Sequence, residues 1–439
     1  MNSQRILEDL AMTRMQIAAV AICVVLNALD GFDVLAISFS APGIAAEWGI
    51  SRAGLGVVLA MELIGMAIGS VSLGGVADRQ GRRPVILACL LTMAAGMYLA
   101  STADSVNTLL AFRFFTGLGI GGMLATTNAM VAEYSNARRR SFNVALMATG
   151  YPIGVIVGGS IASLLLSHFD WRAVFVLGAV LTSALIPAVW FLLPESISFL
   201  AHKRGSNALL EINAILKRMG HAEIDELPED EPDARRTSWR ELFAPNLAKT
   251  TMLLTVAYLT HIMTFYYILK WIPKIVVDMG FTASLAGGVL VWANVGGAAG
   301  SVILGWLTHY FRVRILVIVA LVGAVVMINV FGQGQASLGG LALIAGLAGF
   351  FTNSAIVGLY ALFAESFPTH LRAGGTGFVI GVGRAGAALG PVIAGFLFQA
   401  GYGLPIVSFG MALGSLVAIL MLLMLRDRGQ VPSGLTSMP

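Results

Sequence analysis

Twelve long apolar segments run through this chain of 439 residues, and they constrain its fold more than any other feature. Each is about 20 residues long or more, the length that an α-helix needs to cross the apolar core of a bilayer. Only 11% of the residues are charged, whereas soluble domains carry about 25%. We therefore predict an all-α membrane protein with spans near residues 15–38, 54–76, 84–103, 106–130, 141–165, 171–193, 250–272, 283–309, 313–332, 337–362, 373–397 and 402–425.

A repeated loop motif divides these spans into two sets of six. GGVADRQGRR at Gly74 to Arg83 follows the second span, and the related GWLTHYFRVR at Gly305 to Arg314 follows the eighth. The repeat predicts two pseudo-symmetric six-helix bundles, residues 1–193 and 250–439, joined by a loop at 194–249 that holds a short amphipathic helix. Two such bundles leave a site between them that can open to either side. This arrangement favours a carrier over a channel or an enzyme.

The basic residues gather on one side of the predicted membrane. With both termini on that side, 21 of the 27 Lys and Arg residues fall in its segments, and Arg52, Arg172, Lys270 and Lys274 fall on the other. Short loops rich in Lys and Arg remain in the cytoplasm, so both termini are predicted to be cytoplasmic. This asymmetry also explains the net charge of +4 without nucleic acid as a partner.

Six ionisable residues lie within the predicted spans. Each costs about 2.5–3.5 kcal/mol to insert on translocon scales, so such residues usually serve function. Helix rise places the four of the first half in one layer. They are Asp30, Asp33, Glu62 and Arg113, and the other two are His261 and Arg384.

Asp30 and Asp33 share one helix face because they are three residues apart. Two close carboxyl groups cannot both ionise cheaply, so one is expected to hold a proton. We predict that both, with Glu62 and Arg113, couple transport to protons. The alternative is that Arg113 neutralises Asp30 or Asp33 permanently as a structural pair.

Arg384 has no intramembrane acid in its own half, and a guanidinium binds two carboxylate oxygens in parallel. We predict that it holds a carboxylate substrate, with a salt bridge to a first-half acid as the alternative. Tyr266 and Trp292 are candidates to stack on an aromatic ring, and Asn294 is a candidate hydrogen-bond partner. His261 fits either a proton relay or ligand contact, or a neutral histidine between helices.

At this point the motifs resemble those of the major facilitator superfamily over nearly the whole chain. GGVADRQGRR matches its signature in the loop between spans 2 and 3, and Pro194-Glu195-Ser196 after span 6 also fits. Asp30-Gly31-Phe32-Asp33 resembles the D-G-x-D signature of the aromatic acid:proton symporters. The resemblance implies the major facilitator fold, with monomer as the default, and uptake of an aromatic carboxylate with protons across the bacterial inner membrane. It also implies that Arg384 matches a functional arginine of span 11.

The loop signature predicts a gate as well. Gly74 lets helices meet closely, and Asp78 can accept hydrogen bonds from helix N-terminal amides or nearby arginines. We expect these residues to latch the inner side in one state, together with Arg79, Arg83 and Glu133. The alternative is that the arginines only mark the cytoplasmic face.

Other functions stay open at this stage. They are transport of a non-aromatic carboxylate, export of a drug or metabolite, and a transporter-like sensor that signals through the central loop. Hydroxybenzoates, protocatechuate, gentisate and phenylpropionates all satisfy one arginine and an aromatic pocket. An enzyme is disfavoured, because the sequence shows no nucleophile–base pairing, metal-ligand cluster or nucleotide loop, and no metal or cofactor is predicted.

Overall fold

The computed structural model describes Leu7 and residues 10–204, 207–227, 239–245, 247–368 and 371–425. Within these residues twelve helices are long and apolar enough to cross a membrane, which confirms the predicted number of spans. The first six are α2 (Arg14–Trp48), α3 (Arg52–Gln80), α4 (Arg82–Ser101), α5 (Val106–Tyr134), α6 (Arg140–Leu165) and α7 (Arg172–Leu192). The second six are α10 (Ala248–Asp278), α11 (Ala283–Leu307), α12 (Val313–Gly332), α13 (Leu338–Ser366), α14 (Arg372–Gln399) and α15 (Leu404–Met424). Between them lie the short helices α8 (Ile197–Lys203) and α9 (Ala208–Met219) and the 3-10 helix η1 (Trp239–Phe243).

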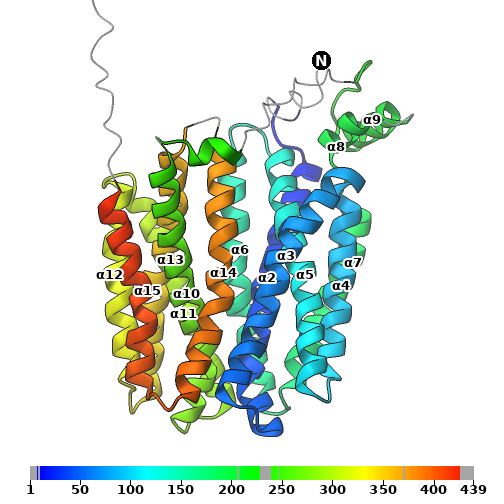
Figure 1. Ribbon diagram of the computed structural model, residues 1–439. Coiled ribbons are helices and arrows are strands. Elements are labelled where there is room, and N and C mark those ends of the chain that lie inside the picture. The colour runs from blue at the N-terminus through cyan, green and yellow to red at the C-terminus, as the bar shows by residue number, and fades with distance from the viewer. Residues whose placement is uncertain are drawn as a thin grey trace, which may run out of the picture.

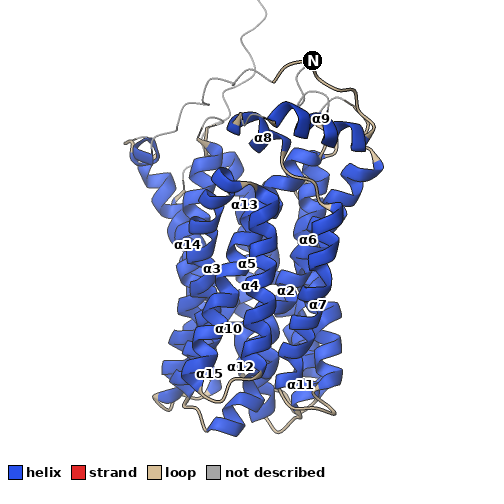
Figure 2. Ribbon diagram, turned by 90° about the vertical axis from the view of Figure 1, so that its right-hand side faces the viewer, coloured by secondary structure: helices blue, strands red, loops and turns tan. Residues whose placement is uncertain are grey.

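The two sets of six helices form bundles with the same internal arrangement. In each set the second helix packs on the fourth, the first on the fifth and the third on the sixth. The second helix of each bundle packs against the fifth helix of the other, as α3 does with α14 and α11 with α6. Figure 1 shows the bundles side by side, and in Figure 2 the described elements are helices throughout. The predicted pair of pseudo-symmetric six-helix bundles is therefore confirmed.

Small residues let helices within a bundle approach closely. An added Cβ on Gly154 of α6 would lie 1.7 Å from the carbonyl oxygen of Ala28 on α2. In the second half, a Cβ on Gly296 of α11 would lie 1.8 Å from the carbonyl oxygen of Gly346 on α13. Such backbone contacts are typical of membrane bundles. They fix how α2, which carries the Asp30 and Asp33 pair, sits against α6.

Two helices run further than the sequence pattern predicts. Helix α2 continues past residue 38 through Pro42 and ends at Trp48, before Gly49 with φ of 59°. Helix α10 continues past residue 272 to Asp278. The charge census assigned Lys270 to an outer segment, and that assignment is wrong, because its side chain is fully buried within α10. Lys270 lies two residues before the predicted end of this span, whereas the helix continues to Asp278.

The bundles are in contact at the end of the molecule opposite α8 and α9, which we call the closed end. There an added Cβ on Gly56 of α3 would lie 2.6 Å from the carbonyl oxygen of Pro391 on α14. Arg52 at the start of α3 forms an ion pair with Asp278 at the end of α10. Its backbone N–H also donates to the side-chain oxygen of Gln399 over 3.1 Å. Toward the α8 and α9 end, which we call the open end, a cavity lies between α3 and α14.

Candidate functional site

Five buried charged side chains meet in the interior, and we call them the charge cluster. They are Asp30 and Asp33 of α2, Glu62 of α3, Arg113 of α5 and Lys270 of α10, each at most 2% exposed. Arg113 forms an ion pair with Glu62, and its guanidinium donates to the backbone oxygen of Asp33 over 2.8 Å. The structure thus brings together the four residues that the sequence placed in one layer.

Lys270 is the cluster member that sequence reasoning missed. Its ammonium lies 3.8 Å from a carboxylate oxygen of Glu62 and donates to the backbone oxygen of Val34. Glu62 therefore faces two cations, one from each bundle. A signal was present in the sequence, since Lys270 lies within the predicted seventh span, residues 250–272.

The two aspartates are not neutralised by Arg113 through their carboxyl groups. Among the described residues, both oxygens of Asp30 and one oxygen of Asp33 have no hydrogen-bond partner. The other oxygen of Asp33 accepts from the Thr182 hydroxyl over 3.4 Å. The alternative of a permanent pair between Arg113 and an aspartate does not describe this structure, in which Arg113 pairs with Glu62. With three carboxyl groups and two cations, one bound proton brings the cluster to neutrality.

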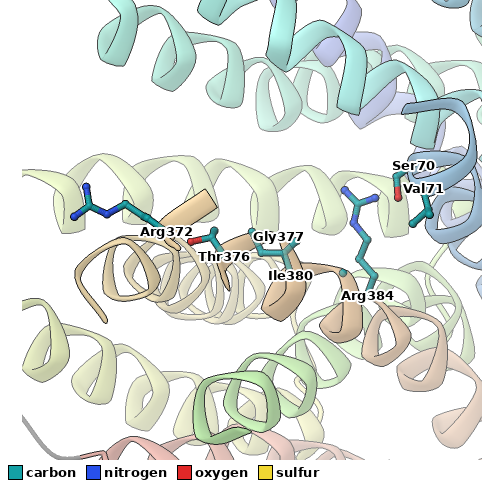
Figure 3. A pocket seen from close by; sticks show the side chains of 8 residues that line it. Ser70, Val71, Arg372, Thr376, Gly377, Ile380 and Arg384 are labelled. Carbon is teal, nitrogen blue, oxygen red and sulfur yellow. The ribbon is translucent and has the colours of Figure 1, made fainter. Parts of the chain in front are cut away.

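A second site lies nearer the open end, in a cavity of about 720 Å³ between α3 and α14. Figure 3 shows Arg384 reaching from α14 toward Ser70 of α3, with Arg372 further along α14. None of the ion pairs within the described part of the chain includes Arg384 or Arg372. The lining residues carry two positive charges and no acid: Ser70, Val71, Arg372, Thr376, Gly377, Ile380, Gly381 and Arg384. This cavity therefore attracts an anion.

Three tyrosine side chains lie within electrostatic reach of Arg384, although none of them is among the residues that line the cavity. Its charge acts on the hydroxyl groups of Tyr258, Tyr266 and Tyr360. The hydroxyls of Tyr258 and Tyr360 are 2.9 Å apart, and the Tyr266 side chain interacts with Tyr151 of the other bundle. Of these four, sequence reasoning selected Tyr266 alone. Nothing in the spacing of the others along α6, α10 and α13 shows that they converge.

Three predicted substrate contacts are not brought to this cavity. Both ring nitrogens of His261 have partners at 2.9 Å, the Ser415 hydroxyl and the backbone oxygen of Thr352. His261 thus joins α10 to α13 and α15 as a satisfied histidine. The amide of Asn294 donates to Leu290 one turn away. Trp292 is 57% exposed on α11 and does not line the cavity.

The loop signature forms a network at the open end, centred on glutamates. Arg82 forms an ion pair with Glu133 at the end of α5. The backbone N–H groups of Arg82 and Arg83 donate to Glu195 over 2.9 and 3.2 Å. Glu133 also accepts from the backbone N–H of Ser198 over 2.7 Å. Arg82 and Glu195 were absent from the predicted gate, yet they hold α4 and α8 together.

Of the remaining predicted gate residues, Arg83 is the one whose side chain has a hydrogen-bond partner within the described residues. Asp78 and Arg79 are exposed, and no ion pair in the described segments includes either of them. An added Cβ on Gly74 would meet only Ala125, at an ordinary 3.8 Å. Arg83 donates through its side chain to the backbone oxygen of Trp190. Within the described residues, the latch expected of Asp78 is therefore not formed in this conformation.

Comparison with known proteins shows the family. A family model described as the Major Facilitator Superfamily matches residues 21–331 and 293–437. The chain belongs to the major facilitator superfamily. This result confirms the resemblance seen in the sequence, and it identifies a multi-pass membrane transporter and not an enzyme.

Similar members of the superfamily are transporters by name. The gallate transporter of Pseudomonas putida is 30% identical over 408 residues, which cover 92% of this chain and 90% of that protein. The 4-hydroxybenzoate transporter PcaK of Acinetobacter baylyi is 30% identical, with 90% and 88% covered. The 3-(3-hydroxy-phenyl)propionate transporter of Escherichia coli is 28% identical, with 93% and 94% covered.

Solved structures of the superfamily share the fold. A D-xylose-proton symporter has a TM-score of 0.69 at 14% identity, covering 93% of this chain and 96% of that one. A bacterial homologue of the human lysosomal transporter Spinster, in an inward-facing and unoccupied conformation, has a TM-score of 0.69 at 15% identity. The match covers 94% of this chain and 95% of that protein's chain.

Proposed function

We propose that this protein takes up an aromatic carboxylate together with protons across the bacterial inner membrane by alternating access. The observation that carries the proposal is Arg384, a cavity-lining guanidinium without an acidic partner among the described residues, whose charge acts on three nearby tyrosines. A carboxylate satisfies its fork with two parallel hydrogen bonds. Aromatic side chains near it suit a flat aromatic ring. The names of the relatives, which include gallate and 4-hydroxybenzoate transporters, support the same substrate class.

The charge cluster is the proposed proton site. An ionised carboxylate in a bilayer interior needs a partner, and both oxygens of Asp30 lack one. We assign the transported proton to the Asp30 and Asp33 pair, with Glu62 and Arg113 fixing the charge around it. Binding a proton here reduces the negative charge of the first bundle by one before the substrate anion neutralises Arg384 in the second.

The basic loops set the proposed orientation. The open end carries α8, α9 and the Arg-rich turn between α3 and α4, so the positive-inside rule places it in the cytoplasm. The conformation described here then faces inward. In the cycle, the outward-facing carrier binds a proton and the substrate, the bundles rock, and both ligands leave at the open end.

The test is uptake of radiolabelled 4-hydroxybenzoate into proteoliposomes, with and without an imposed inward proton gradient. Unlabelled gallate, benzoate, 3-(3-hydroxyphenyl)propionate and succinate serve as competitors. Accumulation that follows the gradient and is blocked by the aromatic acids alone supports the proposal. Block by succinate would indicate a broader carboxylate carrier. Binding without any flux would contradict transport and point to a sensor.

A further inference from the structure

Lys270 is a cation of the second bundle that lies among the acids of the first. Helix α10 carries it across the boundary, where its ammonium donates to Val34 of α2. The same ammonium lies 3.8 Å from Glu62 of α3, and both side chains are fully buried. Within the described residues, Glu62 is the acid with which Lys270 forms an ion pair.

The charge of Glu62 alone does not explain why a lysine is buried beside it. Arg113 already forms an ion pair with Glu62 and lies in the same bundle. A second buried ammonium is costly to dehydrate and adds little to a carboxylate that is already neutralised. The surplus of acid is on α2, where Asp30 and Asp33 have three carboxyl oxygens without partners among the described residues. Lys270 therefore balances the cluster as a whole and not one residue.

The position of Lys270 makes that balance depend on conformation. Lys270 is eight residues from the end of α10, about 12 Å from the closed end by helix rise. Alternating access separates the bundles at this end, and α10 then withdraws the ammonium from Glu62 and Val34. The first bundle is left with three carboxyl groups and Arg113. One additional proton restores the charge that Lys270 had supplied.

We propose that Lys270 is a coupling residue whose ammonium exchanges with the transported proton as counter-charge of the acidic cluster. In the outward-open state Lys270 is withdrawn, and the Asp30 and Asp33 pair takes a proton from the outer water. When the closed end forms, the ammonium returns to Glu62, and that proton passes from its carboxyl group to water in the cavity at Ser70. Lys270 stays protonated throughout, so the only proton that moves is the transported one.

This proposal rests on the proton coupling proposed above. It explains why the proton is released after the closed end forms. The groups that act on Lys270 are Glu62 of α3, Arg113 of α5 and the Val34 backbone oxygen of α2, while Arg384 of α14 lines the cavity. Without the ammonium, formation of the closed end would no longer lower the affinity of the charge cluster for its proton. The carrier would still exchange substrate across the membrane, since exchange does not require proton release.

The experiment compares two assays in proteoliposomes containing the full chain: accumulation driven by a proton gradient, and exchange of internal for external 4-hydroxybenzoate. Lys270→Met removes the charge at similar volume, and Lys270→Arg keeps it. Lys249→Met, an exposed lysine at the other end of α10, is the matched control. We expect Lys270→Met to lower accumulation about tenfold or more while exchange stays within about threefold, because a well-packed apolar residue can replace a buried ion. Lys270→Arg and Lys249→Met should behave as the unmodified protein.

A chemical rescue keeps the test decisive if Lys270→Met does not fold. Lys270→Cys is made with Cys23 and Cys89 replaced by serine, and the thiol is converted to a mixed disulfide by methanethiosulfonate reagents. A 2-aminoethyl adduct restores the ammonium, whereas a methyl adduct restores only bulk. Recovery of accumulation with the first reagent alone supports the exchange of charges. Recovery with both, or with neither, would overturn it.

The outcomes also separate this proposal from the one on which it rests. If the unmodified protein ignores the proton gradient, proton coupling fails, and the role of Lys270 fails with it. If the unmodified protein is coupled and Lys270→Met is coupled to the same extent, only the role of Lys270 is overturned. Loss of exchange in both Lys270→Met and Lys270→Arg would show a structural lysine and also overturn it.

Discussion

The buried charged residues of this membrane protein differ in whether their side chains have a partner. Glu62 is shared by Arg113 and Lys270, whereas Asp30 has no hydrogen-bond partner for either oxygen among the described residues. A buried polar group without a partner is costly, so its retention indicates a ligand that visits it. A proton is the smallest such ligand. Arg384 is the cationic counterpart, and its proposed ligand is correspondingly an anion.

Replacing Asp30 or Asp33 by asparagine is expected to uncouple the carrier. Asparagine keeps the shape of the carboxyl group and cannot bind a transported proton. Gradient-driven accumulation should fall about tenfold or more in each variant, while exchange stays within about twofold, since the loss concerns proton binding alone. Asp104→Asn, in the exposed loop between α4 and α5, is the control. Full accumulation in both variants would remove the aspartates from the coupling mechanism.

Replacing Arg384 by lysine is expected to weaken substrate binding. A lysine keeps the charge and loses the forked pair of hydrogen bonds. A hydrogen bond to a charged group contributes about 1.5–3 kcal/mol, so the Kd for 4-hydroxybenzoate should rise about 10- to 100-fold. Isothermal titration on purified protein measures it, with Arg138→Lys, an exposed residue before α6, as the control. An unchanged Kd in Arg384→Lys would exclude this residue as the carboxylate contact.

Whole elements were predicted with unequal success, and the failures have a physical cause. Apolar length locates a helix by its contact with lipid, so the last part of α10, from residue 273 to Asp278, was cut from its span. The loop signature located the turn between α3 and α4, yet not its partner. Glu195 follows α7, more than 100 residues later in the chain, and its contact with the turn depends on how α8 folds back.

The turn between α3 and α4 supplies a prediction about stability. Gly81 has φ of 109°, and an added Cβ would lie 2.5 Å from a carboxylate oxygen of Glu195. Gly81→Ala should destabilise the protein by about 1–3 kcal/mol, because that backbone conformation suits glycine alone. The control is Gly75→Ala on α3, where an added Cβ meets no atom within 4 Å. Thermal unfolding in detergent should show a lower Tm for Gly81→Ala, and equal Tm values would contradict the contact with Glu195.

At the scale of the whole molecule, the internal repeat was sufficient to predict the architecture. Two copies of one motif predicted two bundles, and the equivalent pairings of α3 with α14 and α11 with α6 confirm them. The functional sites were harder to predict, because they form between the two copies of the repeat. Tyr151 meets Tyr266, and Glu62 meets Lys270, only when the two bundles face each other. Patterns within a span carry no information about a partner on another helix.

Closure of the molecule depends on glycine contacts at the closed end. Gly56→Val would push a side chain into the backbone of Pro391, and only separation of the bundles relieves that clash. We expect this variant to remain open at the closed end and to lose both uptake and exchange. Gly288→Val on α11, where an added Cβ has free space, should transport normally. Distances between spin labels on the starts of α3 and α11 would show the separation, and unchanged distances would contradict it.

The acids of the charge cluster all belong to the first copy of the repeat, and the cavity arginines Arg372 and Arg384 belong to the second. Under the proposed function, the two copies of the repeat have diverged into a half that binds the proton and a half that binds the substrate. Recombination between genes of this group at the central loop would then change what is carried and leave the driving ion alone. Chimeras built with that crossover offer a direct route to carriers for new aromatic feedstocks.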